Sequence, residues 1–234
     1  MRIPFSVPYV PAGAITHIES ALEKSIQQGN GEYSREAERF IERIYQGSHA
    51  LLTPSCTSAI ELSLMLLNIG AGDEVIMPSF NFTSAAAAVT KFWGTPVFCD
   101  IEITTGCIDV NLVERLITNR TKAILWVNYA GLYPNVEKLK LIANKHSLAL
   151  IEDSAHNFGI ISKKLTSNVG DFVTFSFHAT KNIQCGEGGA LLIYNQNVYE
   201  NALIMREKGT NRHEFNDGKV SKYTWINRGS SYLL

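Results

Sequence analysis

Three short segments of the sequence carry residues that could do chemistry, and each lies beside an apolar run. The first is "TPSCTSAIELSL", in which Ser55 and Cys56 lead into a helix expected from Thr57. Free backbone N–H groups and hydroxyls at a helix N-terminus form an anion site, most naturally for phosphate. By itself, this motif is more commonly an ordinary Ser/Thr N-cap.

The second segment is "LALIEDSAH", in which Glu152 and Asp153 close an otherwise apolar strand and His156 follows three residues later. A carboxylate in that position is costly unless it meets a cation. If a turn begins after the strand, His156 lies within reach of the same place. A helix N-cap or a solvated loop carboxylate explains this segment equally well when it is taken alone.

The third segment is "SFHATKNIQCGEGG". Lys181 follows the buried strand expected for "DFVTFSF", together with Ser176 and His178. The glycines of "GEGG" allow the backbone to turn tightly. An isolated lysine is far more often a solvated charge than a catalyst, so this segment also needs support from the rest of the chain.

Together, the three segments supply what pyridoxal phosphate requires: a phosphate cradle, a carboxylate at a strand end and a lysine after the next strand. The lysine forms a Schiff base, and an acidic partner keeps the pyridine nitrogen protonated so that the ring acts as an electron sink. Such an ion pair would hold Asp153 ionised. "SFNFTSAAAA" supplies Phe80 and Phe82 as an aromatic face for the ring, although core packing is the commoner fate of phenylalanine.

The elements that position these residues alternate along the chain. Strands are expected at "EVIMP", "PVFCD", "KAILWV", "LALIED", "DFVTFSF" and "GALLIY". Helices are expected at 12–28, at 34–45 with Ser34 as its N-cap, and at 57–68, 82–92, 111–118, 135–146 and 197–208. Strands separated by helix-length segments predict an α/β fold with a mostly parallel sheet covered on both faces.

Composition excludes several classes of protein. The formal net charge of -1 over 234 residues argues against a dedicated nucleic-acid binder. No apolar run reaches the length of about 20 residues needed to span a membrane, and the N-terminus lacks a signal-peptide core. The four cysteines show no metal-type pairing, so we expect reduced thiols, no metal site and a cytoplasmic location.

The motifs "PSCTSAIELSL", "GDEVIMPSFNFTSAAAA", "GTPVFCDI", "IEDSAH", "SFHATKN" and "GEGGAL" occur in the order found in the DegT/DnrJ/EryC1/StrS sugar aminotransferases. The chain resembles that family over nearly its whole length. The resemblance implies the large domain of a fold-type I, aspartate-aminotransferase-like enzyme, with a mostly parallel seven-stranded sheet, acting as a homodimer.

The resemblance also implies roles for individual residues. Lys181 would be the catalytic lysine that binds the cofactor, and Asp153 would pair with the pyridinium nitrogen. The cofactor's phosphate would be held by Thr57, Ser58 and Ser176, its ring would stack on Phe82, and its ring hydroxyl would lie near His156. "NYAG", at 128–131, would face the sugar.

The implied reaction moves an amine from glutamate to the 4-keto carbon of a dTDP-4-keto-6-deoxyhexose such as dTDP-4-keto-6-deoxyglucose. The product would be dTDP-4-amino-4,6-dideoxygalactose, for enterobacterial common antigen and related surface polysaccharides. Dehydratases of the family carry His at the lysine position, so Lys181 argues against that activity. An aminotransferase acting on another nucleotide ketosugar stays open.

The chain departs from the family at its end, where the composition becomes polar after Lys208 and the sequence stops at "GSSYLL". We expect residues 1–208 to form the cofactor-binding domain. Residues 209–234 would begin a linker to a smaller C-terminal domain that is missing. A truncated fragment that binds pyridoxal phosphate without activity is therefore the alternative function.

Overall fold

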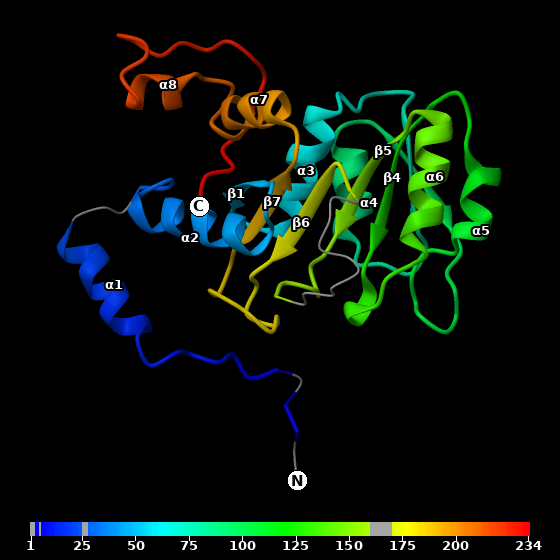
Figure 1. Cartoon of the computed structure of the whole chain (residues 1–234), viewed down its shortest axis with the longest axis horizontal. Helices are drawn as coiled ribbons and strands as arrows, with labels where there is room; N and C mark the ends of the chain where they lie inside the picture. The colour runs from blue at the N-terminus through cyan, green and yellow to red at the C-terminus, as the bar shows by residue number, and fades with distance from the viewer. Residues whose placement is uncertain (1–2, 5, 25–27, 160–169) are drawn as a thin grey trace.

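The computed structural model describes residues 3–4, 6–24, 28–159 and 170–234. Helices and strands alternate through most of the chain, as Figure 1 shows. The elements in chain order are α1 (Ala14–Glu23), α2 (Glu32–Ile44), β1 (His49–Thr53), α3 (Cys56–Leu66), β2 (Glu74–Pro78), α4 (Ser84–Lys91), β3 (Thr95–Cys99), α5 (Val110–Val113), η1 (Glu114–Leu116), β4 (Thr121–Val127), η2 (Tyr129–Gly131), α6 (Val136–His146), β5 (Ala149–Asp153), β6 (Phe172–Ser176), β7 (Gly189–Ile193), α7 (Gln196–Arg206) and α8 (Arg212–Asn216).

The strands form one seven-stranded sheet in the order β1-β7-β6-β5-β4-β2-β3. The neighbours from β6 to β3 pair in parallel, whereas β7 is antiparallel to both β1 and β6. The predicted α/β class with a mostly parallel seven-stranded sheet is therefore confirmed. All six strand segments expected from the sequence are present, and β1 is a seventh that the hydrophobic pattern did not single out.

Both faces of the sheet are covered, which explains why its strands are nearly continuous apolar runs. Helices α3, α4 and α7 pack on one face, and α2, α5 and α6 pack on the other (Figure 1). In β4 the two faces alternate residue by residue: Leu125 joins the core under α3, whereas Trp126 joins the core under α6. Helix α1 stands away from the sheet and has no buried residue.

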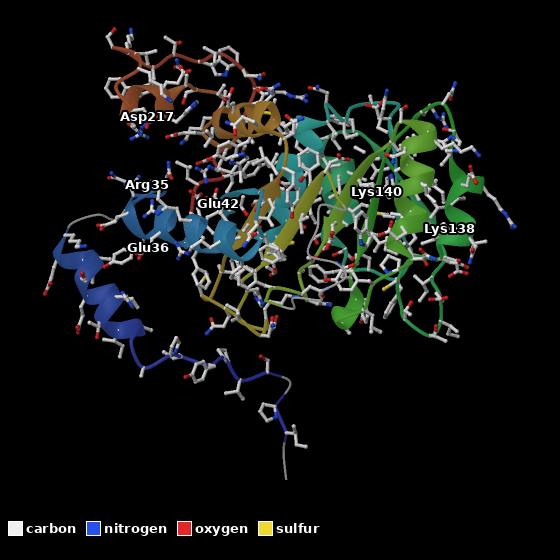
Figure 2. The ribbon with its side chains drawn as sticks, viewed as in Figure 1. Arg35, Glu36, Glu42, Lys138, Lys140 and Asp217 are labelled. Atoms are coloured by element: carbon white, nitrogen blue, oxygen red, sulfur yellow. The ribbon has the colours of Figure 1, made fainter. Side chains whose placement is uncertain are left out.

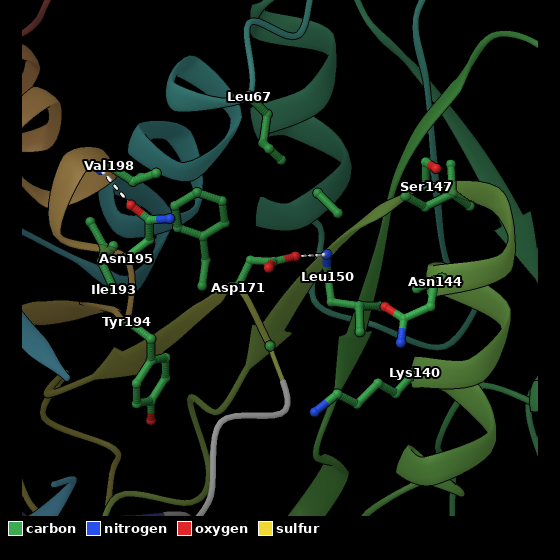
Figure 3. A pocket seen from close by; sticks show the side chains of 15 residues that line it. Leu67, Lys140, Asn144, Ser147, Leu150, Asp171, Ile193, Tyr194, Asn195 and Val198 are labelled. Carbon is green, nitrogen blue, oxygen red and sulfur yellow. Dashed lines mark hydrogen bonds between the residues drawn. The ribbon is translucent and has the colours of Figure 1, made fainter. Parts of the chain in front are cut away.

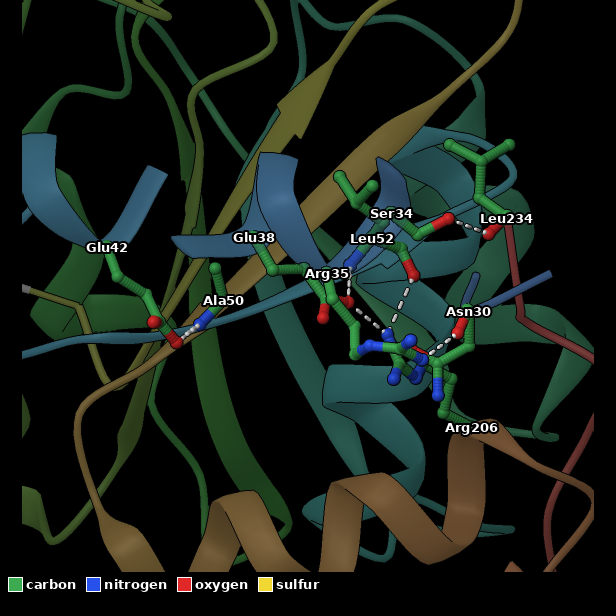
Figure 4. Close-up of polar contacts among 9 residues, drawn as sticks. All are labelled: Asn30, Ser34, Arg35, Glu38, Glu42, Ala50, Leu52, Arg206 and Leu234. Atoms are coloured by element: carbon green, nitrogen blue, oxygen red, sulfur yellow. Dashed lines mark hydrogen bonds and ion pairs between the residues drawn. The ribbon is translucent and has the colours of Figure 1, made fainter. Parts of the chain in front are cut away.

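Helix α2 covers one of the two edges of the sheet, the β1 edge. The backbone N–H groups of Ala50 and Leu52 donate to the carboxylates of Glu42 (3.0 Å) and Glu38 (2.9 Å). These glutamates are four residues apart on α2 and therefore lie on one helix face. Arg206 of α7 forms a buried ion pair with Glu38, so the charge of the buried carboxylate is neutralised (Figure 4). An edge covered in this way cannot pair with a strand of another molecule.

Helices α1 and α2 differ from the sequence-based prediction in ways that matter. Helix α2 begins at Glu32 with Gly31 as its N-cap, so the prediction of Ser34 as the N-cap was wrong. The Ser34 hydroxyl instead donates to the backbone oxygen of Leu234, 2.9 Å away. Helix α1 is shorter than predicted, and residues 25–27 of the predicted 12–28 helix lie outside the described residues.

The last residues of the chain pack against the sheet domain, whereas residues 215–226 are mostly exposed. Tyr232 is buried, and its hydroxyl donates to Glu61 of α3 at 2.6 Å.

Figure 2 shows charged side chains such as Glu36, Lys138 and Asp217 around the outside of the fold. Among the residues that the structure describes, no helix combines the length and apolar character needed to cross a membrane.

Candidate active site

A cavity of about 670 Å³ opens where β4, β5 and β6 end and antiparallel β7 begins. Ligands of open α/β sheets bind at this edge. Six of the predicted site residues line the cavity: Thr57, Phe82, Asp153, His156, Ser176 and Lys181. The seventh, Ser58, does not line it; its backbone N–H and its hydroxyl both contact the Ser55 hydroxyl at 3.1 Å.

Asp153 is the last residue of β5 and is only 5% exposed. Burial raises the pKa of its carboxyl group, while the N–H of Ala155, which donates to it at 3.0 Å, and the charge of Lys181 act in the opposite direction. Among the described residues, no lysine, arginine or histidine forms an ion pair with Asp153. The cavity therefore presents a buried carboxyl group with no ion-pair partner in the described part of the chain.

Cys56 contacts this carboxyl group from α3. Its Sγ lies 3.4 Å from the Thr174 hydroxyl and 3.8 Å from Asp153 Oδ1. Burial raises the pKa of the Cys56 thiol, and the Asp153 charge raises it further. The thiol therefore stays neutral and acts as a weak donor. The sequence indicated Cys56 as part of the helix N-terminus but gave no sign of this contact.

The N-terminus of α3 faces the same cavity. Ser55 is its N-cap and accepts from Ser58 N–H, whereas the N–H groups of Cys56 and Thr57 lie in the first turn and have no helical acceptor. Gly189 of β7 passes so close to the Ser55–Cys56 peptide that a side chain there would displace it. These features suit the phosphate group that the sequence predicted at this position.

Lys181 lies in the loop that connects β6 to β7. Backbone hydrogen bonds shape this loop: Phe177 N–H donates to Gly188 O, Ala179 N–H to Gly186 O, and Lys181 N–H to His178 O at 2.9 Å. Gly186 has a φ of +88°, which favours glycine. The glycine run after the lysine thus turns the chain back into β7, which holds Lys181 at the cavity.

An aromatic wall closes one side of the cavity. The rings of Phe80 and Tyr129 are 4.7 Å apart, and Tyr129 meets the His156 ring edge-on at 5.5 Å. Phe82 also lines the cavity but is 77% exposed, so it lies at the rim. His156 Nδ1 accepts a hydrogen bond from the backbone N–H of Ala130 at 3.1 Å. Burial, and then the charge of Lys181, lower the pKa of His156.

Some lining residues were missed by the sequence reasoning. Glu187 lines the cavity and lies 3.5 Å from His178, and Asn81, Ser84 and Thr180 also reach it. The signal available for Glu187 was a single charge inside a glycine run. Short polar residues such as Asn81 carried no signal, because they are common in any loop.

A second cavity, of about 610 Å³, lies at the opposite edge of the sheet, where β5 and β6 begin (Figure 3). At this edge Asp171 accepts from the Leu150 N–H at 2.8 Å, so its carboxylate is already engaged. None of the predicted site residues lines this cavity. The first cavity is therefore the candidate active site.

Comparison with solved structures identifies close likenesses. The putative sugar aminotransferase Spr1654 from Streptococcus pneumoniae, solved in PLP and PMP forms, is 29% identical with a TM-score of 0.87 over 98% of this chain. PseC from Helicobacter pylori, an aminotransferase of pseudaminic acid biosynthesis, is 28% identical with a TM-score of 0.87 over 99% of it. 3-Amino-5-hydroxybenzoic acid synthase is 29% identical with a TM-score of 0.88 over 100% of it.

The chain spans about 60% of the length of these structures: 61% for the PMP form of Spr1654, 61% for PseC and 60% for the synthase. A family model, described as the DegT/DnrJ/EryC1/StrS aminotransferase family, matches residues 12–232. That match covers the whole sheet, the candidate active site and nearly all of the C-terminal segment. The chain belongs to the DegT/DnrJ/EryC1/StrS aminotransferase family.

Proposed function

We propose that this chain acts in a pyridoxal-phosphate-dependent transfer of an amino group from glutamate to the 4-keto carbon of a dTDP-4-keto-6-deoxyhexose. The observation that carries the proposal is that Lys181 and the buried Asp153 line one cavity together with the N-terminus of α3. A lysine, a carboxylate and a phosphate cradle are the three groups by which proteins hold this cofactor.

The residues fit pyridoxal phosphate. Asp153 is buried and forms no ion pair with any of the residues that the structure describes, so a protonated ring nitrogen would supply a positive charge beside its carboxyl group. Thr57 and Ser176, with the first-turn N–H groups of α3, would hold the phosphate. Phe82 would cover the ring from the rim. When bound, the cofactor supplies an electron sink for the reacting amine.

Lys181 would do the proton chemistry. Its Nζ would hold the cofactor in the cavity and would accept the proton from the α-carbon of the amino donor. Nζ must be uncharged to accept that proton. The Tyr129–Phe80 wall and His156 border the same space and would exclude water from it.

For the substrate, we propose dTDP-4-keto-6-deoxyglucose, with dTDP-4-amino-4,6-dideoxygalactose as product for enterobacterial common antigen or a related polysaccharide. The motifs of the chain support this choice, as does its likeness to Spr1654 and PseC, which are named as a sugar aminotransferase and as an enzyme of pseudaminic acid biosynthesis. We further propose that the protein works in the cytoplasm as a homodimer. Another ketosugar is the alternative, since PseC, an aminotransferase of pseudoaminic acid biosynthesis, matches as well as Spr1654 does.

The test is amine transfer by the purified chain with pyridoxal phosphate, glutamate and dTDP-4-keto-6-deoxyglucose, with the amino sugar detected by mass spectrometry. Lys181→Ala should abolish turnover. Lys222→Ala should not change it, because Lys222 is exposed and does not line the cavity. Amino sugar formed by Lys181→Ala at the wild-type rate would refute the mechanism. Cofactor binding without turnover by the wild-type chain would favour the binding-only alternative.

A further inference from the structure

A buried network of hydrogen bonds joins the ends of β4 and β5. The Asn128 side chain donates to Glu152 Oε1 (2.7 Å) and to Ser154 Oγ (2.8 Å), and its Oδ1 accepts from the Trp126 indole at 3.0 Å. Ser154 also donates to Glu152 at 2.7 Å. All four residues are at most 9% exposed. Both ends of the Asn128 amide are therefore engaged, which fixes the place where the chain leaves β4.

The chain turns sharply after this network. Ala130 adopts the left-handed conformation, with φ 51° and ψ 26°, and Gly131 follows with φ 87°. That conformation is strained for a non-glycine residue, so it persists only where neighbouring contacts impose it. Here the Gly131 N–H donates to Asn128 O at 3.2 Å, and the Ala130 N–H is directed at His156 Nδ1, 3.1 Å away.

We infer that this turn locks His156 as the neutral tautomer with its proton on Nε2, and so makes the ring a fixed hydrogen-bond donor toward an acceptor oxygen of the bound ligand. Nδ1 accepts from a backbone N–H and therefore cannot carry a proton. Among the described residues, none accepts a hydrogen bond from Nε2, while the imidazole lines the cavity. The tautomer itself does not depend on the proposed function. Only the identity of the oxygen that accepts from Nε2–H, on the cofactor or on the sugar, rests on that proposal.

This assignment separates two roles that a histidine in an active site could have. A ring with its proton held on Nε2 recognises an oxygen, whereas a general base needs a free, unprotonated nitrogen. The burial that lowers the pKa of His156 supports the neutral form. Asn128 is then a positioning residue, because it acts on the ligand only through the turn and His156.

The tautomer can be observed directly in nitrogen-15-histidine-labelled protein by two-bond proton–nitrogen correlation spectra. The chain has six histidines, and His156 is identified by the signals missing from His156→Gln. We expect a protonated Nε2 and an unprotonated Nδ1, before and after pyridoxal phosphate is added. A proton on Nδ1, or signals averaged over both tautomers, would overturn the inference. A chain that binds no cofactor would contradict the proposed function, while the spectrum of the free chain would still test the tautomer.

The network is tested with Asn128→Ala. In a variant that still unfolds cooperatively, we expect the His156 signals to move toward the average of the two tautomers. An unchanged single tautomer would show that the network does not position the ring. If Asn128→Ala does not fold, Ser154→Ala is used instead, because it removes two of the four hydrogen bonds within the network. Averaged His156 signals would then support the positioning role, and an unchanged single tautomer would contradict it.

Discussion

The Cys56 thiol lies 3.8 Å from the Asp153 carboxylate, on the side formed by α3. Both groups have a raised pKa because both are buried. A neutral thiol stabilises the carboxylate only weakly. A cationic group of a ligand would therefore gain the most binding free energy by pairing with Asp153. This relationship makes Asp153, rather than the neighbouring Glu152, the residue to change first, since Glu152 is already satisfied by Asn128 and Ser154.

We predict that Asp153→Asn weakens pyridoxal phosphate binding by about two to four orders of magnitude. Breaking one partner of a buried ion pair costs about 3–5 kcal/mol, and the amide cannot neutralise a protonated ring nitrogen. Affinity is measured by equilibrium dialysis. Asp217→Asn is the control, because Asp217 is exposed, does not line the candidate active site and forms an ion pair with Lys219. Equal affinity of Asp153→Asn and wild type would contradict the assigned role.

Gly189→Ala should also weaken cofactor binding, through the phosphate cradle. A Cβ at this position would overlap the Ser55–Cys56 peptide and push the start of α3 away from the cavity. The matched control is Gly70→Ala, where the nearest atom to the added carbon is a backbone oxygen 4.0 Å away. Equilibrium dialysis measures the affinity of each variant for pyridoxal phosphate and for pyridoxal. A loss confined to the phosphorylated compound is expected, and an equal loss for both compounds would place the defect elsewhere.

Glu38→Gln should destabilise the fold by about 3–5 kcal/mol, because it leaves the Arg206 cation buried without its partner. Glu42→Gln serves as the comparison: it keeps an acceptor for the Ala50 N–H and exposes no buried charge, so we expect a loss of less than about 1 kcal/mol. Urea unfolding gives both values. A small loss for Glu38→Gln would mean that water reaches Arg206 and replaces the carboxylate.

Tyr45 should make the fold sensitive to alkaline pH. Burial raises its pKa to about 12, although the Gly159 N–H donates to the hydroxyl at 3.2 Å. In the unfolded chain the Tyr45 hydroxyl ionises near pH 10. The neutral hydroxyl therefore makes its full contribution to the free energy of unfolding below about pH 10, and this contribution is lost as the pH rises to about 12. Tyr45→Phe should therefore lose less stability than wild type between pH 9 and about 11.5. Parallel losses in thermal melts would exclude Tyr45 as a source of the dependence.

The sequence predicted the parts of the fold and of the site that depend on local pattern. Apolar runs that end in polar residues located β5 and β6, and with them Asp153 and Ser176. The Ser-rich start of α3 was recognisable for the same reason, since an N-cap acts on residues two or three positions away. The meeting of these segments followed from parallel topology, because parallel strands bring their carboxyl ends to one edge.

What the sequence could not give are contacts between distant segments. Ser34 looks like an N-cap, but its partner is Leu234, 200 residues away. The edge of strand β1 is completed by Glu38 and Glu42 of α2, which the helical pattern assigns only to a solvent face. The donor to His156 is a backbone N–H in a left-handed alanine, and no side-chain pattern encodes that conformation.

The most direct test of the account is to treat the pyridoxal-phosphate-loaded chain with borohydride, digest it and locate the added mass by mass spectrometry. The account predicts a single modified peptide, with the cofactor fixed to Nζ of Lys181, and no stable adduct in Lys181→Ala. An adduct on another lysine, or none on the wild-type chain, would contradict the central claim that Lys181 holds the cofactor.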